Sequence, residues 1–249
     1  MTIVVKLGGR VQSDTGLARA LHELWNANPG ALCIVHGGGD EVSALQRKLG
    51  REPEFVNGRR VTTDDDVELV RMVLSGSANK RLVALLIAAG LPAAGISGED
   101  GGILPATPID DRLGRAGKPL VPEVGLIRAL LAAGFLPVIS PVATDSTSVL
   151  RAPLNVNGDD AAAAIAAALG ADLWMIADVE GVLDDDKVPV HRLAASQLPP
   201  LVAAGTVNKG MHAKLEAGFA ALEAGSPAVR VTSLQGLSMP GAGTFLSLG

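Results

Sequence analysis

The stretch Thr2-Ile-Val-Val-Lys-Leu-Gly-Gly9 joins a short apolar run to two glycines, with Lys6 as its one charged residue. A lysine in such a run is costly to bury unless an anionic group meets its ammonium group. The glycines that follow would present backbone N–H groups to the same anion. The stretch therefore predicts a buried strand that ends at a phosphate site.

The remainder of the chain alternates between short apolar runs and longer stretches with helical patterning. Strands are expected at residues 3–7, 31–36, 92–96, 136–141, 172–177 and 228–232, and helices near 14–27, 40–49, 65–74, 77–89, 123–133, 159–169, 194–204 and 210–224. A glycine follows five helical stretches, as C-terminal capping glycines do: Gly90, Gly134, Gly170, Gly205 and Gly225. This alternation predicts an α/β fold with a parallel sheet covered by helices on both faces.

Two segments interrupt the alternation. In Phe55-Val-Asn-Gly-Arg-Arg-Val-Thr62, Asn57-Gly58 lies between apolar and β-branched residues and predicts a hairpin. Residues 98–122 are rich in Gly, Pro and Asp, and we expect a hairpin or loop there that serves as a lid. The weakest junction lies near 143–154, so we expect a single domain with two lobes, at about 1–153 and 154–249.

Composition limits the classes of function. The chain has 249 residues, 48% of them apolar, and a net charge of −5 without a basic block, so neither nucleic acid nor a membrane is an expected partner. No apolar run is long enough to span a membrane and no signal peptide is recognisable, which predicts a cytoplasmic protein. The single cysteine, Cys33, lies in an apolar run and is expected in the core.

The sequence lacks the commonest nucleotide and metal motifs: a P-loop, a Gly-x-Gly-x-x-Gly after a strand, and a zinc motif. Instead, His36-Gly-Gly-Gly-Asp40 ends the second expected strand, and its three glycines favour an anion site over a simple loop, with a structural role for the histidine. Lys214 lies in an expected helix, and it would either contribute to the phosphate site or be an ordinary solvated lysine of that helix. The helix that follows Asn155-Val-Asn-Gly would be capped by Asp159 or Asn157, or Asp159 would instead hold Lys6 and Lys214 by its negative charge.

Three further polar groups are open to more than one interpretation. Arg59 and Arg60 of the expected hairpin would be solvent-exposed, or one of them would bind a substrate carboxylate with two parallel hydrogen bonds. Asp64-Asp-Asp66 is best explained as capping of the next helix. The segment 178–184 follows an expected strand and would line an adenine or ribose pocket, whereas Asp184-Asp-Asp186 is expected to be a solvated turn rather than a metal site.

Taken in order, these motifs resemble those of the amino acid kinase superfamily and, within it, of the N-acetylglutamate kinases. The resemblance extends over essentially the whole chain and includes Asn79-Lys80, Gly95-Ile-Ser-Gly98 and Gly210-Met-His-Ala-Lys214. It implies an open three-layer αβα sandwich with a mainly parallel central sheet. It also implies phosphorylation of the γ-carboxylate of N-acetyl-L-glutamate by ATP with Mg²⁺, the second step of arginine biosynthesis.

The resemblance also implies roles for individual residues. Lys6 and Lys214 would stabilise the phosphoryl group in flight, and Asp159 would orient both lysines. Arg60 would bind the α-carboxylate, and N–H groups would contact the transferred group. The phosphoryl- and substrate-binding residues would be Gly8, Gly9, Gly37, Gly38, Gly39, Arg60, Asn155 and Asn157, with the donors on Gly9 and Gly38. The nucleotide would be surrounded by Asp178, Val179, Gly181, Val182, Leu183, Lys209, Gly210 and Met211. No residue is assigned as a metal ligand.

Departures from the family pattern leave alternatives open. Lys209-Gly-Met-His212 stands where Gly-Gly-Met and a small or apolar residue are common, and Asp40 stands where a small residue or proline is frequent. Arginine-inhibited members carry a helix before the first strand, so we expect a homodimer that arginine does not inhibit. The alternatives are a kinase for α-aminoadipate or glutamate attached to an amino-group carrier protein, and a catalytically silent nucleotide-binding protein of the same fold.

Overall fold

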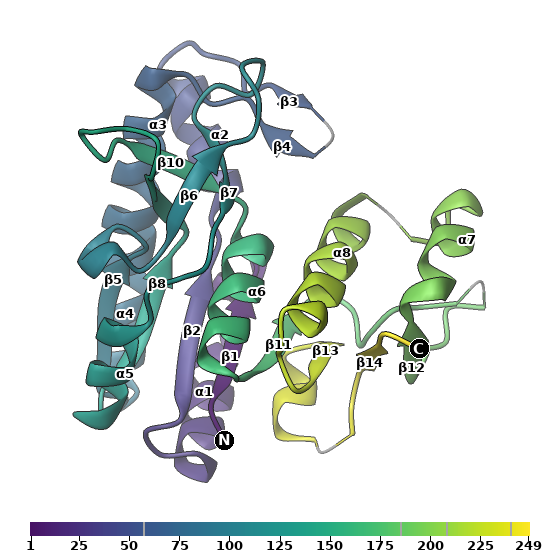
Figure 1. Cartoon of the computed structure of the whole chain (residues 1–249). Helices are drawn as coiled ribbons and strands as arrows, with labels where there is room; N and C mark the ends of the chain where they lie inside the picture. Colours follow the sequence, from purple (N-terminus) through teal and green to yellow (C-terminus); the bar gives the residue numbers. More distant parts are fainter. Residues whose placement is uncertain (57, 185, 208, 240) are drawn as a thin grey trace.

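The computed structural model describes residues 1–56, 58–184, 186–207, 209–239 and 241–249 (Figure 1). Within these ranges, eight strands form the central sheet, in the order β12-β14-β13-β11-β1-β2-β8-β5. Their bounds are β1 (Ile3–Leu7), β2 (Leu32–His36), β5 (Ala93–Ser97), β8 (Leu136–Ser140), β11 (Asp172–Ile176), β12 (Arg192–Ala194), β13 (Val229–Thr232) and β14 (Thr244–Ser247). Neighbouring strands run parallel except β13 and β14, which confirms the mainly parallel sheet.

Helices cover both faces of this sheet. The α-helices are α1 (Leu17–Ala27), α2 (Gly39–Lys48), α3 (Asp64–Arg71), α4 (Asn79–Ala88), α5 (Gly125–Ala132), α6 (Gly158–Leu169), α7 (Leu198–Ala203) and α8 (Lys209–Glu223). Short 3₁₀ segments are η1 (Arg10–Ser13), η3 (Asp100–Gly102), η4 (Ala195–Gln197) and η5 (Gln235–Ser238), and η2 (Met72–Ala78) is a π-helix. One hydrophobic cluster joins the sheet to α5, α6 and α8, and a second joins it to α1 and α4. The αβα sandwich is therefore confirmed.

Strand β1 lies in the middle of the sheet, between β2 and β11. Its side chains alternate between the two faces, as the pleat requires. Val5 packs in the cluster with α1 and α4, whereas Val4 packs in the cluster with α6 and α8. Lys6 shares the face of Val4 by the same alternation, so the strand itself directs its ammonium group toward α6. The chain continues from β1 to β2 on one side and later adds β11 on the other, and the carboxyl ends at such a switch in strand order commonly form a binding site.

Most of the elements expected from hydrophobic periodicity are present. All six expected strands are present with shifts of about one residue, and Cys33 lies in the core, where burial raises the pKa of its thiol to about 12. The five predicted capping glycines all have positive φ. The two helices expected at 65–74 and 77–89 form one continuous helical run, because the π-helix η2 joins α3 to α4. Thr63 and Asp66 form a capping box at the start of α3, which confirms the interpretation of the acidic run.

Two excursions lie outside the central sheet. Strands β3 (Phe55–Val56) and β4 (Arg59–Arg60) form the predicted antiparallel hairpin, although its Asn57 lies outside the described residues. Segment 98–122 contains the antiparallel pair β6 (Pro105–Pro108) and β7 (Ala116–Pro119). This pair closes a small barrel with β9 (Val142–Asp145) and β10 (Pro153–Val156), both of which were missed. Whether the segment moves as a lid stays a prediction.

The division into two lobes stays a proposal. The predicted boundary near residue 153 falls within β10, and the segment interpreted as the weakest junction contains part of the buried strand β9. In Figure 1, β1, β11 and α6 connect the part that contains β2–β10 with the part that contains α7, α8 and β12–β14. In the part of the chain that the structure describes, no helix has the length and apolar character needed to cross a membrane.

Candidate active site

Three buried charged side chains meet beyond the carboxyl half of β1. Lys6 comes from β1, Asp159 from the first turn of α6 and Lys214 from α8. Both ammonium nitrogens lie 2.8 Å from the same atom, Oδ1 of Asp159. Each of the three residues is less than a tenth exposed. The contacts expected of Asp159 are therefore present, and the packing of α6 against α8 brings them about (Figure 1).

The charges of this triad are unequal. Burial by itself would raise the pKa of Asp159, but the ammonium groups of Lys6 and Lys214 outweigh burial and lower this pKa to about 2. Burial is also the largest influence on Lys214, and with repulsion from Lys6 it lowers the pKa of Lys214 to about 8 despite the attraction of Asp159. One carboxylate thus faces two ammonium groups, so the charged triad retains a positive charge that favours an anion beside it.

Two glycine loops flank the triad, one after β1 and one after β2. They approach so closely that a Cβ atom on Gly9 would lie 3.6 Å from Cα of Gly38, and one on Gly38 would lie 2.8 Å from Cδ2 of Leu74. The N–H of Gly37 donates to the carbonyl of Leu7 at 2.9 Å, so this N–H is not available to a ligand. Within the described residues, the N–H groups of Gly9 and Gly38 donate to no backbone carbonyl. Both are placed to serve an anion.

Two side chains hold the loops in place. Nε2 of Gln12 donates to the carbonyls of Gly37 at 2.8 Å and Gly8 at 3.4 Å, which ties the loops together. His36 is fully buried, with Nδ1 2.9 Å from the carbonyl of Gly37 and Nε2 3.1 Å from Nδ2 of Asn79. Burial lowers the pKa of His36, and a neutral ring that donates from Nδ1 satisfies both contacts. The structure thus gives His36 the hydrogen-bonding role expected of it, whereas no sequence pattern marked Gln12.

A cavity of about 240 Å³ lies beside the triad and is lined by both glycine loops, the β3–β4 hairpin and residues 155–158. Arg60 lies in its wall and is buried. Nη2 of Arg60 donates to the carbonyl of Gly39 and to Oγ of Ser43, both at 2.8 Å, and Nη1 donates to Oε1 of Gln46. Gln46 in turn donates to Asp66 at 3.0 Å. These bonds hold a cation at the wall of the cavity, where it can attract a carboxylate.

Asn155 and Asn157, which precede α6, also line this cavity. Nδ2 of Asn155 donates to Oγ1 of Thr62 at 3.0 Å, and that hydroxyl donates to the carbonyl of Arg60 at 3.1 Å. Oδ1 of Asn157 accepts from the N–H of Asp159 at 2.8 Å. The helix cap is thus Asn157, which leaves the carboxylate of Asp159 free to contact the lysines.

A larger cavity and a smaller space next to it also border the triad. A cavity of about 530 Å³ shares Lys6, Gly9, Gly39 and Asp159 with the first and adds Gly8, Asp178, Val179, Gly210, Met211 and Lys214. From Val179 and Met211 a space of about 130 Å³ continues to Gly181, Val182 and Leu183. Apart from Gly8 and Lys214, the residues added here are those expected to surround the nucleotide, and the side chain of the remaining one, Lys209, lies outside the described residues. Two cavities therefore meet at the triad and the glycine loops.

The acidic turn after β11 is described at Asp184 and Asp186, and its hydrogen bonds are those of a turn. Oδ1 of Asp184 accepts from the N–H groups of Asp186 at 3.0 Å and Val188 at 2.8 Å, as an Asx turn does, while Asp185 lies outside the described residues. Across the residues that are described, no three His, Cys, Asp or Glu side chains are grouped to hold a metal ion. The solvated-turn interpretation is thus the one that the hydrogen bonds support.

Comparison with known proteins defines the family. The model of the amino acid kinase family matches residues 1–233. The chain belongs to this family. Acetylglutamate kinase of Roseiflexus castenholzii is 41% identical over 241 residues, which cover 95% of this chain and 91% of that protein. Acetylglutamate kinase of Cereibacter sphaeroides is 43% identical over 234 residues, which cover 91% of this chain and 78% of that protein.

Solved structures agree with this membership of the amino acid kinase family. The crystal structure of smu.665 from Streptococcus mutans has a TM-score of 0.86 and 25% identity, and the match covers 100% of this chain and 99% of that one. Carbamate kinase from Giardia has a TM-score of 0.71 and 16% identity, with 100% and 99% of the two chains covered. The second likeness shows a shared fold alone.

Replacement of Asp159 by Asn tests the triad. Removing one partner of a buried ion pair leaves Lys6 and Lys214 without their counter-charge, so we expect the free energy of unfolding at pH 7 to fall by about 3 kcal/mol in a urea titration. The pKa of Asp159 in the folded protein, about 2, lies below its ordinary 3.8. Its stabilising contribution is therefore complete above pH 3.8 and lost as the pH falls toward 2, so the difference from the wild type should shrink in that window.

A matched control is Asp65→Asn, which removes an exposed pair with Arg51. We expect this change to cost less than about 1 kcal/mol. Equal losses in the two variants would contradict the central role of the triad.

Proposed function

We propose that this protein is an acetylglutamate kinase. It transfers the γ-phosphoryl group of ATP to the γ-carboxylate of N-acetyl-L-glutamate, which yields ADP and an acyl phosphate for arginine biosynthesis. The observation that carries the proposal is that two cavities meet at one cationic triad. Arg60 lines the smaller cavity, and the segment after β11 lines the larger one. Relatives that carry this name and share about 40% identity over more than nine-tenths of the chain support it.

The acceptor occupies the smaller cavity. Its α-carboxylate pairs with Arg60, which its hydrogen bonds already fix in the wall, and Asn155 contributes an amide to the same space. The γ-carboxylate then lies toward Lys6 and the glycine loops. A carboxylate is ionised at neutral pH, so the acceptor needs no general base, and orientation is the main requirement.

ATP occupies the larger cavity as its Mg²⁺ complex, with the adenosine toward residues 179–183 and the phosphates toward the triad. The approach of two anions is the main barrier, and fixed positive groups that meet the charge in the transition state lower it. Lys6 and Lys214 supply these charges, and Gly9 and Gly38 supply N–H donors. Asp159 holds both ammonium groups in place against their mutual repulsion, at 2.8 Å from each.

The first test is the identity of the acceptor. The purified protein is incubated with MgATP and either N-acetyl-L-glutamate or L-glutamate, and acyl phosphate is trapped with hydroxylamine. We expect hydroxamate only with the acetylated compound. As a control against a contaminating kinase, Lys6→Met should lower kcat by about 10²–10³-fold, since it removes a charge that acts on the transition state.

No hydroxamate with either free acceptor, in a protein that binds ATP, would contradict the proposal. Turnover of glutamate or α-aminoadipate attached to an amino-group carrier protein would then support the carrier-dependent kinase. ATP binding without turnover of any of these acceptors would support a silent nucleotide-binding protein.

The pKa of Lys214 predicts the alkaline limb of the pH profile. Only the protonated ammonium group stabilises the transferred phosphoryl group, and the pKa of this group is lowered to about 8 in the free protein. We therefore expect kcat/KM for ATP, which reports the free enzyme, to fall as the pH rises through about 8. Lys214→Arg should move this limb upward, because a guanidinium stays protonated. A profile that is flat to pH 9.5 in the wild type would contradict the assignment.

The homodimer expected from the resemblance is also part of the proposal. Among the described strands, β5 pairs with β8 alone and forms one end of the central sheet, so it offers an edge at which two copies can join. One chain has a mass of 25.3 kDa, and sedimentation equilibrium should give twice this value. A single-chain mass at micromolar concentration would contradict it. A cytoplasmic location stays a prediction of the sequence.

A further inference from the structure

An ion pair links the β3–β4 hairpin to α6 directly beside the site. Nη1 of Arg59 lies 2.7 Å from Oδ2 of Asp160, and the side chains are 35% and 21% exposed. The partners are separated by 101 positions in the sequence. Both partners are sequence neighbours of site residues: Arg59 directly precedes Arg60, and Asp160 directly follows Asp159. The pair therefore lies at the border of the acceptor cavity, yet the mechanism above does not use it.

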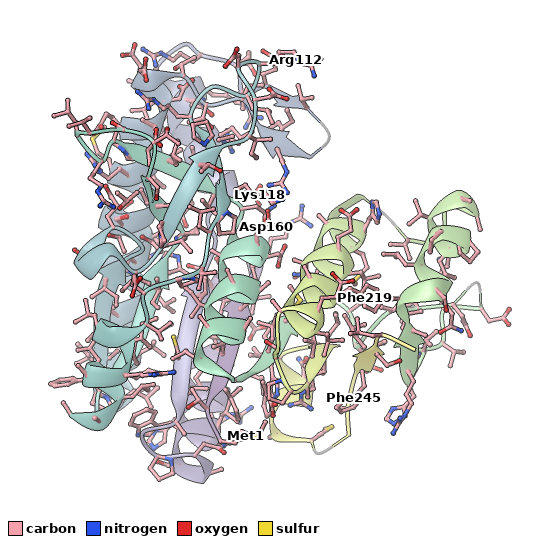
Figure 2. All side chains as sticks on the ribbon, in the orientation of Figure 1. Met1, Arg112, Lys118, Asp160, Phe219 and Phe245 are labelled. Carbon is pink, nitrogen blue, oxygen red and sulfur yellow. The ribbon has the colours of Figure 1, made fainter. Side chains whose placement is uncertain are left out.

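A second space lies on the far side of this pair. It is a groove of about 500 Å³ between the segment that follows β7 and the facing sides of α6 and α8. Its floor is made of alanine side chains, namely Ala163, Ala164, Ala167, Ala168, Ala217, Ala220 and Ala224. Arg59 lines both the acceptor cavity and the groove, and Asp160 lines the groove. Figure 2 labels Asp160 near the start of α6, close to Lys118 of β7, which also lines the groove.

The acceptor has one substituent that can reach this border. With the γ-carboxylate at Lys6 and the α-carboxylate at Arg60, the remaining group on the α-carbon is the N-acyl amide. That carbon then lies toward Arg60, and Arg59 lines the same cavity as well as the groove. An acetyl group is short enough to end within the acceptor cavity, whereas a longer acyl chain that extends toward the groove has to pass the Arg59–Asp160 pair.

We propose that the Arg59–Asp160 ion pair is a partition that determines specificity: it separates the acceptor cavity from the alanine-lined groove and restricts the N-acyl group to a short one. The proposal rests on the proposed function. The chemistry of the groove supports it, because a floor of methyl groups fits a saturated acyl chain once the partition is removed. Neither Arg59 nor Asp160 takes part in phosphoryl transfer, so both act on acceptor selection alone.

The design of the variants follows from the burial of the pair. Burial raises the pKa of Asp160, although the attraction of Arg59 opposes that rise. Removing the arginine alone would leave a mostly buried carboxylate without its partner, which is more disruptive than removing both charges. The open variant is therefore Arg59→Ala with Asp160→Ala. A closed variant without charge, Arg59→Met with Asp160→Leu, retains the bulk of the partition.

A matched control is available elsewhere in the chain. Arg71 pairs with Glu99, and the side chains are 38% and 21% exposed, close to the values of the first pair. Neither residue lines the acceptor cavity or the groove. Arg71→Ala with Glu99→Ala thus removes a comparable ion pair without opening a partition.

The experiment compares kcat/KM for N-hexanoyl-L-glutamate and N-acetyl-L-glutamate, with MgATP, in all four proteins. In the open variant, we expect the hexanoyl-to-acetyl ratio to rise by about tenfold or more, because added methylene groups gain apolar contact in the groove. In the closed variant and the control, the ratio should remain within about twofold of the wild type. A rise confined to the open variant supports the partition.

Several results would overturn the inference. An open variant that phosphorylates N-acetyl-L-glutamate with an unchanged ratio would do so, as would a wild type that uses both acceptors equally. An equal rise in the closed variant would show that charge rather than bulk excludes the longer chain, and would also overturn it. Should the double alanine variant not fold, Arg59→Ser with Asp160→Asn opens the same border and is judged by the same ratio. A wild type inactive on N-acetyl-L-glutamate would instead contradict the proposed function.

Discussion

The sharing of one carboxylate between two buried ammonium groups is the interaction on which the rest of the structure depends. Asp159 has to lie 2.8 Å from lysines that come from β1 and α8, so the central strand, α6 and α8 must converge at one point. Desolvation of three charges is costly, and the carboxylate offsets it only in part. The lowered pKa values of Asp159 and Lys214 express that balance. Among the described residues, Asp159 is the one carboxylate paired with these lysines, and a phosphoryl group has the charge to be their second anion.

The α/β architecture provides this convergence with few special features. Parallel strands place their carboxyl ends at one edge, so the glycine loops after β1 and β2 lie together without long connections. The helix dipoles of α2 and α6 point their positive ends at the same region. Alternation along β1 directs Lys6 to the face that α6 covers. A substitution in the apolar part of β1 would therefore shift the cation as well as the core.

Local patterns predicted the strands, the helices and the hairpin because each depends on periodicity or turn chemistry within a short window. They missed β9, β10, β12 and β14, which are three or four residues long, and the first three of these include Asp, Pro or Arg. Strands this short are defined by their partners in the sheet, and a window of sequence contains no partner. Gln12 and Gln46 were missed for the same reason, since their acceptors lie 25 and 20 positions away. Asp159 was found because its neighbours form a motif.

The hairpin shows how much a one-residue offset decides. Arg59 and Arg60 are adjacent on a two-residue strand, so the pleat directs their side chains to opposite sides. Arg60 meets the carbonyl of Gly39 and the hydroxyl of Ser43, whereas Arg59 meets Asp160 on α6. The hairpin residues by themselves left open which of the two would face a substrate, and only the family resemblance singled out Arg60, because the answer depends on the register of the hairpin against α2 and α6. Once that register is set, Arg60 is fixed beside the second glycine loop and Arg59 is fixed against α6, and the different roles proposed for them follow from these positions.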